Sequence, residues 1–389
     1  MYLSQVEGYG YDIWIFKIWS RAVYFTGFAH FYDGIRSDYP PFYIYFLWAI
    51  GTFYKSFISF SFDIDSPVFT FLIKMPAMIA DISTAFLIFL IVRRYGSFRL
   101  AFLSMISYSF NPAIIYNSAI WGQVDSVYTL FFMFALMQLV SDKPMLSGIF
   151  LTLAILTKPQ SLVLLPLFVL FILRKQSLST SVKTAAASCA AFVVVAFPFY
   201  PATSILTIFK QYSSSYIQYP YNSLNAFNIW AFTGMFQPDD TQFMFITYRT
   251  WGYLLFGMIF ICVAYFTLKN KDNMSIYISS AILFFAFFMF FTRIHERYLF
   301  PVFAPLAVAM TLDRRFSYVY VLATITFLFN LHFVLEETKS GFGLPNAEFL
   351  IPVTAGINLI LLIYTVYSYS KMKIDAMVLN TSEQTIRLK

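Results

Sequence analysis

Apolar runs long enough to cross a lipid bilayer recur along this chain from about residue 67 to residue 369. A helix of about 20 apolar residues spans a hydrocarbon core of about 30 Å. The chain is 59% hydrophobic and 12% charged, and its mean hydropathy is +0.69. Backbone groups in lipid must be satisfied internally, and the runs lack the alternation of barrel strands. The sequence therefore predicts an all-α polytopic membrane protein.

The apolar runs predict about 11 transmembrane helices. Their approximate ranges are 67–92, 100–118, 127–140, 146–157, 160–173, 184–199, 250–268, 274–292, 297–312, 316–333 and 350–369. Two short runs meet at "TKPQ", where Pro159 removes a helix donor and disfavours helix at Lys158. We therefore expect a helical hairpin with Lys158 near its tip.

Basic residues are concentrated in one set of connections between the predicted spans, and this asymmetry indicates the orientation. The set comprises Arg93, Arg94, Arg99, Lys143, Arg174, Lys175, Lys183, Lys269, Lys271, Arg314, Arg315, Lys371 and Lys373. We place these connections and the tail 372–389 in the cytoplasm, and the transmembrane domain at 67–371. The segment 1–66, which we expect to carry amphipathic helices, the loop 200–249 and "RIHER" then lie on the extracytoplasmic side.

The chain begins on the outer side in this arrangement. Its first residues, "MYLSQVEGYGYD", are too short and too polar to span a bilayer or to act as a signal sequence. We therefore expect that a preceding transmembrane helix is missing from this sequence. An apolar run encoded upstream in the reading frame would support this expectation, and its absence would contradict it.

Ionisable residues beside apolar spans are informative, because burying each one costs several kcal/mol unless it is paired or hydrated. In "GYDIWIFKIWSRAV", Ile13, Phe16, Trp19 and Val23 follow helical spacing, which predicts an amphipathic helix on the membrane surface. Asp12 stands at the start of this helix. Its carboxylate is suited either to cap the helix or to accept a proton from a hydroxyl group.

Two further clusters follow in the chain. The stretch "SDYPPFYIYFLWAIG" predicts an interfacial or re-entrant helix below Asp38, since its proline pair fixes an extended entry and its aromatic side chains favour the headgroup level. In "KMPAMIADI", Lys74 and Asp81 lie two turns apart and share one helix face. They are interpreted either as a structural ion pair or as part of a functional site.

The remaining clusters are "WGQVDS", in a polar turn between two spans, and "RIHER". If all five clusters meet on one face, they form an outward-facing cavity with both signs of charge. Its carboxylates would be Asp12, Asp38 and Asp125, and its cations Lys74, Lys158, Arg293 and Arg297. Cations among apolar helices suit the phosphate of a lipid, and carboxylates suit a hydroxyl nucleophile. This combination indicates sugar transfer from a lipid phosphate.

Taken in order, these motifs resemble those of the integral-membrane glycosyltransferases of the GT-C class, particularly the enzymes that use dolichyl-phosphate-linked glucose or mannose. The resemblance covers most of the chain and is carried by "GYDIWIFKIW", "SDYPP", "KMPAMIADI", "WGQVDS" with "LTKPQ", and "RIHERYLFP". The last stretch is similar to the family's His-Glu-basic motif. The family's first transmembrane helix precedes its catalytic loop, which agrees with the expectation of a missing helix here.

The resemblance implies a polyprenyl-phosphate sugar donor, an acceptor hydroxyl, and Asp12 as the general base of the first outer loop. The donor phosphate is expected near His295, Arg297, Arg293, Lys158 and Lys74. The acceptor or the sugar is expected near Asp38, Tyr39, Trp121, Gln123, Asp125 and Glu296. The role of Glu296 stays open, since it is suited to orient either His295 or Arg297. We expect no metal ion or other cofactor, and no nucleic-acid partner.

Our hypothesis is an inverting transfer of a hexose to a lipid-linked glycan, with a protein acceptor as the competing possibility. The reaction would take place on the outer or lumenal face of the plasma membrane or the endoplasmic reticulum membrane. The alternative is a transporter or flippase of a lipid-linked sugar, which predicts polar residues at the bilayer midplane in broken helices. The charged clusters instead gather at one face, with Asp81 as the exception. A purely structural membrane subunit would leave these clusters without a role.

Overall fold

The computed structural model describes residues 8–35, 37–200, 207–269, 272–340 and 348–372 of the chain, and they are mainly helical. The α-helices are α2 (Gly10–Thr26), α3 (Phe31–Gly34), α4 (Pro41–Phe57), α5 (Pro67–Arg93), α6 (Phe98–Ser109), α7 (Pro112–Ile115), α8 (Asp125–Val140), α9 (Pro144–Thr157), α10 (Leu165–Lys175), α11 (Leu178–Ala196), α12 (Thr207–Ile217), α13 (Tyr248–Lys269), α14 (Ser275–Phe290), α15 (Phe303–Leu312), α16 (Arg315–Ser340) and α17 (Leu350–Ser370). A π-helix, η1 (Tyr116–Trp121), and the 3-10 helices η2 (Pro159–Leu164), η3 (Phe197–Phe199), η4 (Ile229–Thr233) and η5 (Glu296–Val302) connect them. The strands β1 (Gln242–Phe243) and β2 (Ile246–Thr247) form one antiparallel pair.

Five helical segments in the described part of the chain are long and apolar enough to cross a membrane. They are α5, the α11–η3 segment, α13, Arg315–Glu337 of α16, and α17. A sixth candidate is α6 followed by α7 and η1, which is bent by 41° at its break, and α8, α9 and α14 are shorter apolar helices. The chain is thus an integral, multi-pass membrane protein of the all-α class, while the expected count of about 11 spans is not confirmed.

Proline and small polar residues set many of the helix boundaries. Helices α4, α5, α7 and α9 begin with proline, whose missing N–H costs nothing in the first turn. The side chains of Ser97, Asn111 and Ser177 cap α6, α7 and α11. At Lys158 the backbone is extended, with φ −154° and ψ 129°, so α9 ends before it and η2 begins after it. The predicted helix break at this residue is confirmed.

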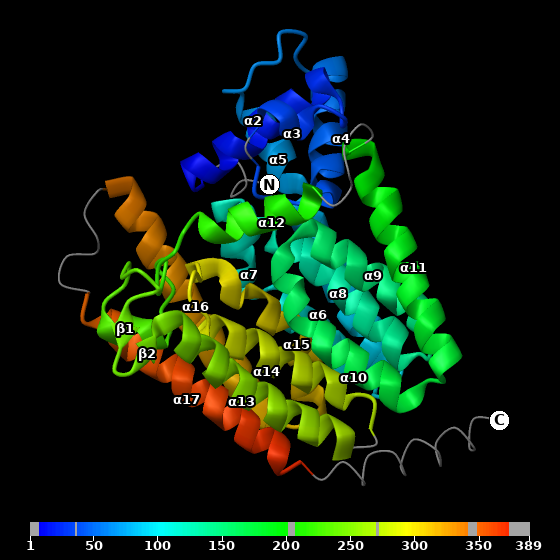
Figure 1. The fold of residues 1–389 in the computed structure, drawn as a ribbon, viewed down its shortest axis with the longest axis vertical. Coiled ribbons are helices and arrows are strands. Elements are labelled where there is room, and N and C mark those ends of the chain that lie inside the picture. Colours follow the sequence, from blue (N-terminus) through cyan, green and yellow to red (C-terminus); the bar gives the residue numbers. More distant parts are fainter. Residues whose placement is uncertain (1–7, 36, 201–206, 270–271, 341–347, 373–389) are drawn as a thin grey trace.

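Helices α2, α3 and α4 lie together at one end of the molecule, drawn in blue in Figure 1. The predicted apolar residues of α2, Ile13, Phe16, Trp19 and Val23, are buried and join one hydrophobic cluster with side chains of α4 and α5. The predicted apolar face of this helix is therefore confirmed. Its partners are protein helices, however, and Lys17 on the same helix is also buried.

Helix α14 lies at the centre of the C-terminal half of the bundle, packed against α13, α15 and α17 (Figure 1). Most of its side chains are buried, which agrees with its nearly uniform apolar sequence. The helix ends at Phe290, and the chain then runs through "RIHER" into η5. This path fixes the motif at the end of the bundle's most buried helix.

Candidate active site

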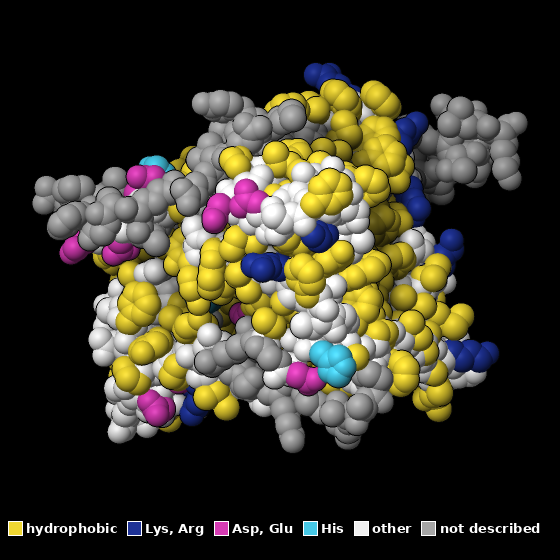
Figure 2. All heavy atoms as spheres, turned by 90° about the horizontal axis from the view of Figure 1, so that it is seen from above, with side chains coloured by type: hydrophobic (Ala, Val, Ile, Leu, Met, Phe, Trp, Pro, Cys, Tyr) yellow, Lys and Arg dark blue, Asp and Glu magenta, His cyan; other side chains and the backbone are white. Residues whose placement is uncertain are grey.

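A cavity of about 1020 Å³ lies between α2, the Lys158 break, α12, the 218–236 segment and "RIHER". Eight residues that the sequence predicts for the site line it, namely Asp12, Asp38, Tyr39, Lys158, Arg293, His295, Glu296 and Arg297. Lys74, Trp121, Gln123 and Asp125 are not among its lining residues and lie behind its wall. Figure 2 looks at the molecule from the α2–α4 end and shows a hollow among hydrophobic side chains with an acidic side chain inside it.

Asp12 lies in the first turn of α2, and its carboxylate points to the η1–α8 turn. Its Oδ2 accepts a hydrogen bond of 3.3 Å from Trp121 Nε1 and a second one from Gln123 Nε2. The N-cap residue of α2 is Tyr9, and no side chain caps this helix. The capping interpretation of Asp12 is therefore wrong. Asp12 also lines the cavity.

The turn that carries these two donors depends on a glycine. Gly122 has φ +91°, and a Cβ there would lie 2.3 Å from Ile13 Cδ1. The ring of Tyr9 stacks on that of Trp121 with centroids 5.2 Å apart, and Tyr9 N donates to Trp121 O over 3.2 Å. The start of α2 is thus fastened to the end of η1, which positions Asp12 beside Gln123.

Lys74 supports the same turn from behind. Its Nζ donates to the carbonyl oxygens of Ala119 and Ile120 over 3.1 and 2.8 Å. These carbonyls lie at the C-terminal end of η1, where a cation is favourable. No ion pair between Lys74 and Asp81 occurs in the described structure, so the ion-pair interpretation of these two residues is wrong. The position of Lys74 also argues against its predicted contact with a donor phosphate.

Lys158 is paired with Asp125 in the wall of the cavity. The Nζ–Oδ1 distance is 2.5 Å, and both side chains are buried. The ammonium group lies 5.5–5.9 Å from the ring centroids of Tyr39, Tyr128 and Tyr298. Burial lowers the pKa of Lys158, while the neighbouring Asp125 carboxylate works in the opposite direction. Since one carboxylate already neutralises it, Lys158 adds little net charge to the cavity.

Arg297 faces the cavity, and not all of the N–H groups of its guanidinium have partners in the described structure. Its Nη1 donates to Glu296 Oε1 over 2.8 Å, and its Nε is buried without a hydrogen-bond partner in the described structure. Glu296 Oε2 lies 4.0 Å from His295 Nδ1. The shorter contact of Glu296 is therefore with Arg297. Burial raises the pKa of Glu296, and the charge of Arg297 opposes this shift.

His295 is positioned by its backbone and by aromatic neighbours. Its backbone forms isolated β-bridges with Leu224 and Asn225. Its ring packs on the rings of Tyr219 and Tyr298, with centroids 5.8 and 5.3 Å away. Burial and the nearby cations lower its pKa well below the usual value of 6.5. The imidazole is thus neutral at pH 7, and it offers a hydrogen bond to a phosphate but no positive charge.

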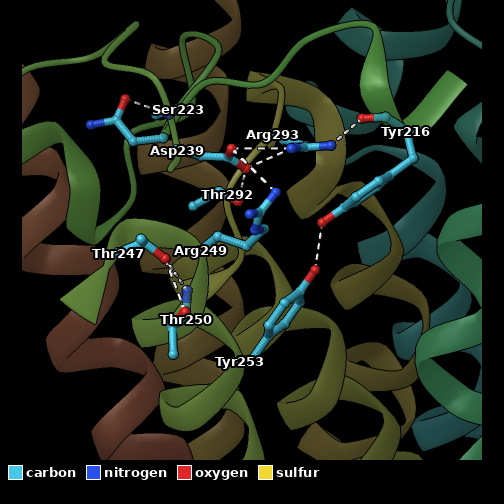
Figure 3. Close-up of polar contacts among 10 residues, drawn as sticks. Tyr216, Ser223, Asp239, Thr247, Arg249, Thr250, Tyr253, Thr292 and Arg293 are labelled. Carbon is cyan, nitrogen blue, oxygen red and sulfur yellow. Dashed lines mark hydrogen bonds and ion pairs between the residues drawn. The ribbon is translucent and has the colours of Figure 1, made fainter. Parts of the chain in front are cut away.

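Arg293 pairs with Asp239, an acidic residue that the sequence analysis did not identify (Figure 3). Its Nε and Nη2 donate to the two oxygens of Asp239 over 2.6 and 3.0 Å, and Thr292 Oγ1 donates to the same carboxylate over 2.9 Å. These contacts lower the pKa of Asp239, although burial opposes them. The guanidinium also lies 4.0 Å from the ring centroid of Tyr216. Its charge is neutralised, so Arg293 fastens the loop that carries Asp239 to "RIHER" and is poorly suited to bind phosphate.

Asp38 and Tyr39 form the wall next to α2. Asp38 faces the cavity and is exposed there, and desolvation by the surrounding protein raises its pKa, while Arg297 and Lys158 oppose this shift. Tyr39 is buried, and its hydroxyl donates to Gln123 Oε1 over 3.4 Å. Gln123 therefore links the Asp12 carboxylate to the wall that carries Asp38.

Sequence reasoning missed two polar residues at this cavity. Gln160 lines it, and its Oε1 is buried without a hydrogen-bond partner in the described structure. Its place directly after "TKP" was the signal that could have identified it. Asp239 is the second, and no pattern in the loop sequence marks it as the partner of Arg293.

A comparison of the chain with protein-family models finds no match, and a comparison with curated proteins finds none either.

Proposed function

We propose that this chain is an inverting glycosyltransferase that moves a hexose from a polyprenyl-phosphate donor to an acceptor hydroxyl on the extracytoplasmic or lumenal face. The observation that carries the proposal is the pairing of two groups across one cavity. Asp12 is a carboxylate held only by neutral donors, and Arg297 is a cation with a partnerless buried Nε. Their charges lie near enough to interact. A hydroxyl nucleophile and a phosphate leaving group need these two partners.

The reaction we propose is a single displacement at the anomeric carbon. Asp12 accepts the proton of the acceptor hydroxyl as the new oxygen–carbon bond forms. The bond between the anomeric carbon and the phosphate oxygen breaks, and the polyprenyl phosphate leaves with its electron pair. Arg297, held by Glu296, stabilises the charge on this phosphate, and His295 donates a hydrogen bond to it.

Apolar lining on one side of the cavity supports a lipid-borne substrate. Phe256 of α13 and Phe287 and Phe291 at the end of α14 line it, and so do Leu162, Val163 and Pro166 after the Lys158 break. Arg297 lies in the same cavity, and so does Gln160, whose Oε1 has no hydrogen-bond partner in the described structure. A polyprenyl phosphate matches this combination, since its head needs cations and its chain needs an apolar surface.

The decisive experiment incubates the purified protein with radiolabelled glucosyl- and mannosyl-polyprenyl phosphates in the presence of membrane glycolipid acceptors. We expect a labelled glycolipid product whose anomeric configuration is opposite to that of the donor. Asp12→Asn should abolish product formation, while Asp33→Asn, an exposed acid near the same end of the molecule, should not. If neither donor yields product with the wild-type protein, the proposal fails.

A transporter or flippase of a lipid-linked sugar remains the second candidate, and one observation favours it. Transporters often carry discontinuous helices with polar residues near the midplane. Here α6, α7 and η1 form a bent pair, and Asp81 lies near the middle of α5. Movement of a fluorescent polyprenyl-phosphate sugar across reconstituted vesicles, without a covalent product, would favour this candidate over transfer.

A further inference from the structure

The hairpin formed by β1 and β2 carries large apolar side chains at its turn. The strands pair through Phe243 and Ile246, so Met244 and Phe245 form a two-residue loop. Met244 has φ +59°, a conformation for which two-residue hairpin loops usually use glycine or asparagine. The side chains of Met244 and Phe245 are 74% and 68% exposed. Neither turn preference nor packing within the described part of the chain accounts for these two residues.

The hairpin leads directly into α13, which is long and apolar enough to cross a membrane. Its 22 residues are about 33 Å long, little more than a hydrocarbon core of about 30 Å. Tyr248 and Trp251 lie in its first turn, and Lys269 ends it. Aromatic and basic side chains favour the two boundaries between lipid and water. The N-terminal end of α13 therefore lies at the level of the lipid headgroups.

The turn of the hairpin lies beside α13 and does not extend away from it. The ring of Phe243 stacks on that of Tyr248 with centroids 5.2 Å apart, and the ring of Phe245 contacts that of Trp251 with centroids 4.9 Å apart. Trp251 Nε1 also donates to Phe243 O over 3.1 Å. Since Trp251 lies almost one turn further into the helix than Tyr248, the loop is level with the first turn of α13.

The loop also continues the lipid-facing surface of α13. Only 17% of the apolar window of this helix is buried. Its exposed apolar side chains recur at helical spacing, and they include Leu254, Met258, Ile261, Tyr265 and Leu268. Trp251 lies three residues before Leu254 and so faces the same side of the helix. Because Phe245 packs on Trp251, the turn is on the side of α13 that faces lipid.

We infer that the β1–β2 hairpin is a membrane anchor, whose loop inserts Met244 and Phe245 between the headgroups and the acyl chains at the N-terminal end of α13. Apolar side chains are favourable at this depth, and their burial offsets the strain of the positive φ at Met244. Backbone groups entering this region need hydrogen-bond partners. Strand pairing and the Trp251 indole supply such partners here.

The anchor would fix the loop that carries Asp239. Arg249 N, in the first turn of α13, donates to Asp239 O over 3.0 Å, and the Asp239 carboxylate binds Arg293 of "RIHER". The hairpin thereby connects the membrane surface to a wall of the cavity. The inference stands independently of glycosyl transfer, because it concerns the depth of this segment in the membrane.

The test places a fluorescent nitrobenzoxadiazole label on the loop of the full chain in lipid vesicles. Cys189→Ala and Cys262→Ala remove the exposed native thiols, and either Met244→Cys or Asp240→Cys then supplies a single labelling site. We expect the label at position 244 to be quenched by lipids that carry a nitroxide near the headgroup. Iodide, present on both sides of the vesicles, should quench it several-fold less than the label at position 240, an exposed site outside the turn.

A second variant separates anchoring from folding. Met244→Gly relieves the backbone strain, so it should keep the melting temperature in detergent, yet it should raise iodide quenching of a label at Phe245→Cys several-fold. Gln242→Ala, at an exposed polar position of β1, is the matched control and should leave this quenching unchanged.

Two results would overturn the inference. One is iodide quenching at position 244 equal to that at position 240. The other is protection from iodide without quenching by the lipid nitroxide, which would indicate a protein partner, such as a second copy of this chain, in place of lipid.

Discussion

Trp121 Nε1 donates to Asp12 Oδ2 over 3.3 Å, and this bond joins the first helix of the described chain to the end of a π-helix 109 residues later. Gln123 donates to the same oxygen. Two neutral donors fix the direction of this carboxylate, which a general base requires.

Replacing Asp12 by asparagine tests the base directly. Asp12→Asn should lower the transfer rate by about 10²–10⁴, because the acceptor hydroxyl loses its proton acceptor. The melting temperature should change little, since the amide preserves the size of the side chain. The measurement is product formation from a polyprenyl-phosphate sugar, and an undiminished rate in this variant would remove Asp12 from the mechanism.

Gln123 is expected to act through Asp12 rather than on the substrate, because it is buried and does not line the cavity. Gln123→Met should lower kcat by roughly tenfold, the equivalent of one hydrogen bond of about 1.4 kcal/mol. KM for the donor should stay unchanged.

A double-mutant cycle separates this role from a structural one. If Gln123 only positions Asp12, then adding Gln123→Met to Asp12→Asn should cost no further activity. Additive losses in the double variant would mean that Gln123 acts on its own.

Arg297 is expected to bind the donor phosphate. Arg297→Ala should raise the KM for the donor by roughly tenfold or more, because the charge that meets the phosphate is removed. KM for the acceptor should change far less. Glu296→Gln should have an intermediate effect on the donor, since the guanidinium keeps its charge and loses its anchor. Equal effects of Arg297→Ala on both substrates would contradict a phosphate role.

The lowered pKa of His295 predicts a specific pH behaviour. Because burial and the nearby cations hold this pKa well below 6.5, the imidazole stays neutral throughout the range from about pH 6.5 to 8. Donor affinity should therefore not rise through His295 as the pH falls across this range. The check is the donor KM at both limits for the wild-type protein and for His295→Gln. A tightening at the acidic limit that disappears in the variant would show a charged histidine.

Much of the helical framework could be predicted from the sequence, because it depends on local signals. Apolar runs locate the helices, and proline marks where several begin, as at Pro159 after the Lys158 break. The number of spans could not be counted in this way. A segment such as α6 with α7 is interrupted at Asn111 and Pro112, and apolarity alone does not distinguish one bent span from two short helices.

The gathering of charged residues at one cavity was also predictable, since the ordered motifs, apart from Asp81, fall at the same ends of the predicted spans. The partner of each charged residue could not be predicted. Arg293 pairs with Asp239, which lies 54 residues away, and Lys74 bonds to carbonyl groups rather than to Asp81. Such choices depend on three-dimensional neighbours, and sequence spacing does not specify them.

The last prediction follows from the pairing of Asp239 with Arg293, and it concerns stability rather than catalysis. The lowered pKa of Asp239 means that its carboxylate binds its proton less readily in the folded state than in the unfolded state. The resulting stabilisation is fully present above the unfolded value of about 3.9 and is lost as the pH falls through the lowered folded value. Asp239→Asn should lower the free energy of unfolding at pH 7 by about 3 kcal/mol, because it leaves Arg293 without its partner.

The neighbouring residue supplies the matched control for this prediction. Asp240 is exposed, whereas Asp239 is 1% exposed, so Asp240→Asn should leave the melting temperature unchanged. Thermal unfolding of both variants at pH 7 and at several pH values below about 3.9 measures the difference. The difference in melting temperature between the wild-type protein and Asp239→Asn should narrow as the solution is acidified, because protonation of Asp239 weakens its pair with Arg293. A difference that stays constant down to the lowest pH at which the protein folds would show that the ion pair with Arg293 does not stabilise the loop that carries Asp239.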